Sequence, residues 1–209
     1  MKKLNTIIKT LEREFPKPAV ELVYSNPLEL LVGTILSAQC TDERVNRVTA
    51  TLFKKYRTAK DYAQADPGVL EQEIRSTGFY KSKAKNIIRC CQSLMQRFGG
   101  RIPQTMEELT TLPGVWRKTA SVILGNCFGQ PAIVVDTHVL RVSRRLGLTG
   151  SEDPDRVEQD LARLLPQKLW TRVSHQLLLH GRYVCKAKTP LCSSCGMRPV
   201  CPYYPSRSV

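Results

Sequence analysis

The chain has 209 residues, of which 42% are hydrophobic and 24% are charged. This composition supports one large domain or two small lobes, excludes an intrinsically disordered chain, and contains no apolar run approaching the ~20 residues of a membrane span. The 32 basic and 18 acidic residues give a net charge of +14, which favours a polyanionic partner, most often nucleic acid.

Most of the chain shows the period of amphipathic helices, separated by proline, glycine and capping residues. The predicted helices cover residues 3–15, 28–38, 42–56 with Asp42 as the cap, 66–76, 83–98, a short segment capped by Thr105 with Glu108, one segment after Gly114, one after Asp136, 154–165 and 169–181. Residues 133–135 resemble a strand, but one run of this length cannot make a sheet. The sequence therefore predicts an all-α fold.

Basic residues dominate the last quarter of the chain. The last acidic residue is Asp160, and residues 161–209 contain eight basic residues, which contribute +8 of the net charge of +14. These residues are Arg163, Lys168, Arg172, Arg182, Lys186, Lys188, Arg198 and Arg207. A stretch with basic but no acidic residues favours a surface that faces phosphates over an ordinary solvated surface.

Four of the eight cysteines lie close together near the end of the chain. Their spacing is Cys185-x6-Cys192-x2-Cys195-x5-Cys201. Four thiolates so close in sequence can surround one metal centre, and this chemistry leaves zinc and an iron–sulfur cluster both open. The other four, which we expect to be core residues on apolar helix faces, are Cys40, Cys90, Cys91 and Cys127.

A tight turn, Leu112-Pro113-Gly114-Val115, joins two predicted helices. Glycine lets a phosphate approach the backbone, and the free N–H groups of the following helix point toward such an anion. A helix–hairpin–helix of this kind binds a DNA backbone without reading the sequence.

Lys118 lies on the first turn of the helix that follows this hairpin, and Asp136 follows an apolar run 18 residues later. A helix N-terminus and the neighbouring Arg117 both disfavour the ammonium form of Lys118 and so favour a nucleophilic amine. Asp136 alone is most simply a helix cap. Together, the two residues predict a nucleophile and its acid–base partner.

These motifs together closely resemble the bacterial endonuclease III family, from about residue 4 to residue 203. The motifs that carry the resemblance are Leu112–Val115, Arg117–Ala120, Val135–His138, Leu179–Arg182, the cysteine spacing, and Leu36–Gln39 with Thr41–Asp42. The resemblance implies a bifunctional DNA glycosylase and AP lyase of base-excision repair. It also implies two helical lobes with a DNA groove between them: a six-helix domain over about 20–130, and a cluster domain formed by 1–19 and 131–209.

By the same resemblance, the four clustered cysteines hold a [4Fe–4S] cluster. Lys118 attacks the sugar of a flipped, oxidised pyrimidine nucleotide such as thymine glycol, and forms a Schiff base. Asp136 stabilises the positive charge that develops on the sugar, and β-elimination cuts the strand 3′ to the abasic site. The implied substrate is double-stranded DNA with damaged pyrimidines or abasic sites.

The resemblance also implies DNA contacts. Gln39 matches the position that fills the gap left by the flipped base, and Phe79 matches an apolar wedge. His138 matches a residue that lines the pocket or supports Asp136. The remaining implied contacts are Asp42, Gly114, Trp116 and Arg117.

Trp116 is a departure from the family, which has a second glycine at this position of the hairpin. The indole can lie beside the phosphate, stack on a sugar or cover Lys118, and a side chain here can require a different backbone angle. We therefore expect weaker DNA binding or an altered lesion preference.

Other interpretations share parts of this pattern. Adenine-mismatch glycosylases carry the same cluster but lack a lysine at the position of Lys118, and thymine-mismatch specificity depends on pocket residues. A non-catalytic iron–sulfur DNA-binding relative and a zinc-stabilised DNA-binding module are alternatives from a different class. We expect no signal peptide, no membrane partner, a monomer, and a place in the bacterial cytoplasm near the nucleoid.

Overall fold

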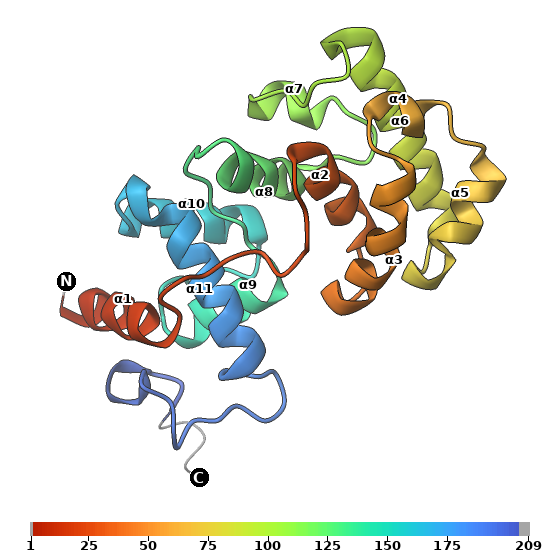
Figure 1. Ribbon diagram of the computed structural model, residues 1–209. Coiled ribbons are helices and arrows are strands. Elements are labelled where there is room, and N and C mark those ends of the chain that lie inside the picture. The colour runs from red at the N-terminus through yellow and green to blue at the C-terminus, as the bar shows by residue number, and fades with distance from the viewer. Residues whose placement is uncertain (1, 205–209) are drawn as a thin grey trace. The chain divides into compact units, whose positions relative to one another are not determined.

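The computed structural model describes residues 2–204, so Arg207 of the predicted basic surface lies outside the described residues. Within this range the regular secondary structure is helical throughout (Figure 1), which confirms the predicted all-α class. The α-helices are α1 (Lys2–Glu14), α2 (Pro27–Leu36), α3 (Asp42–Lys55), α4 (Ala59–Ala63), α5 (Pro67–Glu73), α6 (Tyr80–Phe98), α7 (Met106–Thr110), α8 (Arg117–Cys127), α9 (Thr137–Arg145), α10 (Pro154–Leu164) and α11 (Trp170–Tyr183). The short 3-10 helices are η1 (Arg75–Thr77), η2 (Gln167–Leu169) and η3 (Arg198–Val200). No helix in the described range is both long enough and apolar enough to cross a membrane.

The chain divides into two compact units. The first, which we call the hairpin unit, is Val20–Gln130 and contains α2 to α8. The second, which we call the cysteine-loop unit, joins Met1–Ala19 to Pro131–Val209 and contains α1 and α9 to α11.

Helices α2 and α6 form the centre of the hairpin unit. Helix α2 is apolar on nearly all faces and begins at Pro27, with the Asn26 side chain accepting the Glu29 N–H at 3.0 Å. Helix α6 packs against α2, α4 and α5, and α8 packs against α2 and α7. This arrangement places the α7–α8 hairpin directly on the buried core.

The core of the cysteine-loop unit combines the first helix with the last three. Its fully buried residues include Ile7, Leu11, Val139, Val142, Val157, Leu161, Val173 and Leu177. Helix α1 packs against α11 (Figure 1), and the Gln176 side-chain amide donates to the Phe15 carbonyl at 2.9 Å. The N-terminal segment is therefore an integral part of this unit, although it precedes the hairpin unit in sequence.

Several predicted helix boundaries were wrong. Helix α4 was missed because it has only five residues, although Thr58 and Asp61 form a capping box at its start. Helix α6 begins at Tyr80 rather than at residue 83. Helix α3 is capped by Thr41, and Asp42 is its first residue rather than its cap.

The strand-like run and two of the predicted core cysteines also differ from expectation. Residues 133–135 form an extended segment without a ladder, in which the Val134 N–H and C=O both pair with the Ser174 hydroxyl, at 2.9 and 2.8 Å. Cys40 lies in the turn after α2, not on a helix face, and is only half-buried. Cys127 ends α8 and is also half-buried, because the apolar face of that helix does not extend to its last residue.

Candidate functional site

The α7–α8 hairpin has the geometry of a turn that requires one glycine. Gly114 has a φ of +76°, and a Cβ built on it would lie 2.8 Å from the Asn86 Cβ of α6. The Val115 N–H donates to the Leu112 carbonyl at 3.1 Å and closes the turn. Gly114 is therefore required both by its backbone conformation and by the close approach of α6.

Trp116, which replaces the second family glycine, has an ordinary extended backbone. Its φ is −97° and its ψ is 168°, and its carbonyl accepts the Ala120 N–H at 2.9 Å at the start of α8. A side chain here therefore causes no backbone strain, which removes the expected need for a different backbone angle. Trp116 is 79% exposed, so its indole lies on the surface and is not part of the core.

Lys118 is exposed on the first turn of α8, next to Arg117 and close in sequence to Trp116. The following residues, Thr119 and Ala120, are buried and fix this turn against the core. The first N–H groups of a helix have no partner within the helix. This end of α8 thus combines backbone donors, an amine and an aromatic side chain in one accessible place.

Asp136 caps α9, as the simplest interpretation of the sequence predicted. Its Oδ1 accepts the N–H groups of His138 and Val139 at 2.9 and 2.8 Å. The His138 ring lies 3.1 Å from the Arg141 guanidinium, which also donates to the Gly181 carbonyl at 2.9 Å. These bonds fix the carboxylate and the imidazole at the start of α9.

Gln39 and Phe79 lie in two exposed loops of the hairpin unit and share an uncommon backbone conformation. Their φ values are 54° and 48°, and among the described residues they are the non-glycine positions with positive φ. Phe79 is 67% exposed, so it is not a core residue. Asp42 is half-buried at the start of α3, shortly after Gln39.

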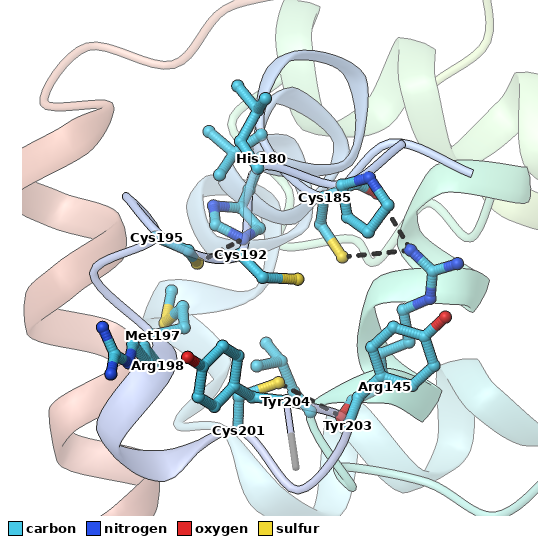
Figure 2. A pocket seen from close by; sticks show the side chains of 14 residues that line it. Arg145, His180, Cys185, Cys192, Cys195, Met197, Arg198, Cys201, Tyr203 and Tyr204 are labelled. Atoms are coloured by element: carbon cyan, nitrogen blue, oxygen red, sulfur yellow. Dashed lines mark hydrogen bonds between the residues drawn. The ribbon is translucent and has the colours of Figure 1, made fainter. Parts of the chain in front are cut away.

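The four clustered cysteines line one pocket of about 370 Å³, a volume that includes its open mouth. Figure 2 shows Cys185, Cys192, Cys195 and Cys201 around this space, with Arg145 and His180 at its edge. Within the described residues, no three His, Cys, Asp or Glu side chains converge closely enough to hold a single ion. Because a tetrahedral zinc site needs sulfurs about 2.3 Å from one ion, this pocket suits a centre of several atoms better.

Side chains from distant helices hold the cysteine loop. Arg145 of α9 donates to Cys185 Sγ at 3.4 Å and to the carbonyls of Lys186 and Ala187 at 2.8 and 2.9 Å. The imidazole of His180 has Nε2 3.8 Å from Cys195 Sγ and Nδ1 3.1 Å from a Glu14 carboxylate oxygen. Burial raises the pKa of the Cys195 thiol to about 11. Burial also lowers the pKa of His180, and the Glu14 carboxylate opposes this second shift.

The basic surface at the end of the chain is partly neutralised within the cysteine-loop unit. Arg172 pairs with Glu12 of α1 at 3.5 Å, and Arg163 lies 3.9 Å from Asp160. The sequence could not show the first of these pairs, since Glu12 lies at the opposite end of the chain.

Sequence reasoning missed Arg145, which bonds to the cysteine loop, and did not single out Lys83, which is a buried lysine of α6. Arg145 follows Arg141 by four residues on a helix, so their common face was visible in the sequence. The sequence did carry a signal for Lys83, which lies four residues before Ile87 on the apolar face of α6, whereas Lys81 and Lys85 lie outside that face.

Comparison with known proteins identifies the family. A profile of HhH-GPD superfamily base excision DNA repair proteins matches residues 32–167. The endonuclease III of Synechocystis sp. is 50% identical over 197 residues, which cover 94% of this chain and 90% of that protein. The endonuclease III of Bacillus subtilis is 45% identical over 202 residues, which cover 96% and 92%. The chain belongs to the endonuclease III family.

A solved structure supports the same assignment. The structure described as a trapped endonuclease III–DNA covalent intermediate is 44% identical in sequence, has a TM-score of 0.95, and covers 100% of this chain and 98% of that chain. The family confirms the predicted class of enzyme, a DNA glycosylase and AP lyase. As an endonuclease III relative of this fold, the protein is a DNA-binding enzyme of base-excision repair.

Proposed function

We propose that this enzyme removes oxidised pyrimidines such as thymine glycol from double-stranded DNA and cleaves the abasic site, with Lys118 as the nucleophile. The observation that carries the proposal is the place of Lys118, exposed on the first turn of α8 and directly after the Gly114 hairpin. A further support is that a relative 44% identical to this chain yields a trapped covalent intermediate with DNA.

In the proposed reaction, the Lys118 amine attacks C1′ of the flipped nucleotide, a C1′–N bond forms, and the bond to the damaged base breaks. The base leaves with a proton, and the sugar opens to a protonated Schiff base on Lys118. Loss of a C2′ proton then breaks the C3′–O bond, so that the downstream strand leaves with its 5′-phosphate. Hydrolysis of the Schiff base restores the amine.

Asp136 would stabilise the positive charge on the sugar and assist the proton transfers. Its two backbone hydrogen bonds through Oδ1 hold the carboxylate in one orientation, which such a role requires. His138, held by Arg141, would line the pocket or support Asp136.

DNA binding would divide between backbone and base contacts. Gly114, Trp116 and Arg117 would meet a phosphate and its sugar at the start of α8, without reading the sequence. Phe79 would wedge into the stack, and Gln39 would fill the gap left by the flipped base. Asp42 would support the Gln39 loop at the start of α3. We propose further that the enzyme acts as a monomer on DNA of the bacterial nucleoid.

We propose that Cys185, Cys192, Cys195 and Cys201 ligate a [4Fe–4S] cluster. The four thiols line one pocket, and a [4Fe–4S] centre takes one thiolate on each of its four irons. Bound there, the cluster would supply cross-links for the loop and no step of the proposed reaction. Arg145 would donate a hydrogen bond to the thiolate of Cys185, which compensates part of its charge.

Borohydride trapping tests the nucleophile. The protein is mixed with a duplex carrying thymine glycol or an abasic site, and a covalent band is sought after reduction. We expect the band with both duplexes, its loss in Lys118→Ala, and its retention in Lys60→Ala, which removes an exposed lysine of α4. Intact DNA binding without any band on either duplex would favour a non-catalytic relative instead.

A further inference from the structure

Lys83 is a buried lysine for which the proposed chemistry has no use. It lies in the first turns of α6, and only 4% of its surface is exposed. A buried ammonium group is costly unless it is hydrogen-bonded, so its place needs an explanation. Burial lowers the pKa of Lys83, and the nearby Cys40 thiol opposes the shift.

The ammonium group of Lys83 joins two helix ends. Its Nζ donates to the carbonyl oxygens of Leu36 and Thr77, each at 2.8 Å. Leu36 is the last residue of α2 and Thr77 is the last residue of η1. Carbonyls at helix C-termini lack partners within the helix and carry partial negative charge, so they are favourable acceptors for a cation.

Both helix ends lead directly into the loops that carry the proposed base-pair contacts. Gln39 follows Leu36 by three residues, and Phe79 follows Thr77 by two. Both have left-handed backbones, with φ of 54° and 48°. Such conformations in non-glycine residues are strained and persist only when the surrounding structure enforces them. The Lys83 side chain bonds to Leu36, shortly before Gln39, and to Thr77, shortly before Phe79.

We propose that Lys83 is a positioning residue that holds the Gln39 and Phe79 loops as one rigid pair. Insertion of a wedge and filling of the vacated gap must occur together at one base pair, so the spacing of the two side chains decides whether they act jointly. This inference rests on the proposed DNA contacts of Gln39 and Phe79. It predicts that Lys83 matters for opening a duplex and not for the chemistry of Lys118.

The test compares a duplex that must be opened with a strand that need not be. We measure single-turnover borohydride trapping on a duplex with an abasic site and on the same abasic strand without its complement, so that the chemistry is the same, and take the ratio of the two rates. In Lys83→Met, which keeps the apolar stem, we expect this ratio to fall on the order of tenfold, since misplacing a group by about 1 Å can cost a hundredfold. The exposed neighbour Lys85→Met is the matched control and should keep the ratio within about twofold.

Two further variants separate positioning from general damage to the fold. Lys83→Arg retains a cation that can donate to both carbonyls. We expect its ratio of duplex to single-strand trapping to be at least half that of the unmodified protein. In a protein that already carries Gln39→Ala and Phe79→Ala, Lys83→Met should lower the ratio no further, because the side chains it positions are gone. If Lys83→Met is too unstable to purify, Lys83→Gln takes its place in the same measurements.

The possible results distinguish the positioning role of Lys83 from the proposed role of Lys118 as the nucleophile. A Lys83→Met ratio equal to that of Lys85→Met, or an equal loss of trapping on the duplex and on the single strand, would overturn the positioning role. An additive loss in the Gln39→Ala Phe79→Ala background would overturn it as well. Failure of the unmodified protein to trap an abasic site in either the duplex or the single strand would instead count against the proposed nucleophile.

Discussion

The Gly114 hairpin and the cysteine loop, residues 185–201, which contains the short η3, differ in how much of their support comes from distant parts of the sequence. The hairpin is closed by a bond from Val115 to Leu112, three residues away, and by helices α7 and α8 on either side. The cysteine loop has turn bonds of its own, such as the one from the Cys195 N–H to the Cys192 carbonyl, but it is also bound by Arg145, some 40 residues earlier. It lies against α1, at the other end of the chain.

The contact with α1 is close. A Cβ on Gly196 would lie 2.8 Å from side-chain atoms of Arg13 and Glu14 and 2.9 Å from Thr10. Met197 is fully buried in the unit's core, whereas the neighbouring Ser194 and Arg198 are exposed. The comparison teaches that a turn bond and a left-handed glycine against α6 define the hairpin, whereas the cysteine loop depends more on residues far away in the sequence.

The largest effect should come from removing one thiol of the loop. We expect Cys192→Ala to lose the visible absorbance and iron of the proposed cluster. The midpoint of its thermal unfolding should fall by roughly 10 °C or more. A structural metal centre adds several kcal/mol to the free energy of unfolding, and each kcal/mol shifts the midpoint by about 2–4 °C in a chain of this size. Cys127→Ala, which removes a half-buried thiol from α8, should keep the absorbance. Equal spectra for the two variants would contradict the proposed ligand set.

The hairpin should be sensitive to one glycine. We expect Gly114→Ala to lower the free energy of unfolding by about 2–3 kcal/mol, since it combines a left-handed backbone with the close approach of Asn86. Gly129→Ala has a similar φ of +62° with no atom within 4 Å, so it isolates the backbone cost of about 1 kcal/mol. Urea unfolding measures both. If the two variants lose the same stability, the contact with α6 does not contribute.

Arg145→Met tests the dependence of the cysteine loop on a distant helix. It removes the donors to Cys185, Lys186 and Ala187, and we expect a loss of about 1–2 kcal/mol together with faster release of iron to a chelator. Arg144→Met is the control, because Arg144 forms an exposed ion pair with Glu152. Unchanged iron release in Arg145→Met would show that the loop holds its shape without α9.

The smallest change in stability should come from Trp116→Gly, because the extended backbone at this position suits either residue. We expect stability to stay within about 0.5 kcal/mol. The Kd for an abasic-site analogue, or the relative rate on different lesions, should change by a few fold, since the indole is exposed beside the proposed phosphate contact and nucleophile. Unchanged affinity together with an unchanged lesion profile would mean that Trp116 has no part in recognition.

The sequence by itself determined the features that depend on neighbouring residues. Helical periodicity predicted an all-α chain, and the Leu112–Val115 turn, the cap at Asp136 and the spacing of the cysteines were all visible, because each involves residues a few positions apart. The same local motifs, in their order, were sufficient to identify the endonuclease III family.

Tertiary structure decided what depends on segments far apart in the chain. Only the fold shows that Lys83 joins the ends of α2 and η1, that Arg145 and Glu14 reach the cysteine loop and its histidine, and that Trp116 is exposed without strain. Periodicity places a side chain on one face of one helix. It does not state which carbonyl or thiol a neighbouring segment brings within hydrogen-bond distance of that face, because this is set by packing between residues up to 166 positions apart.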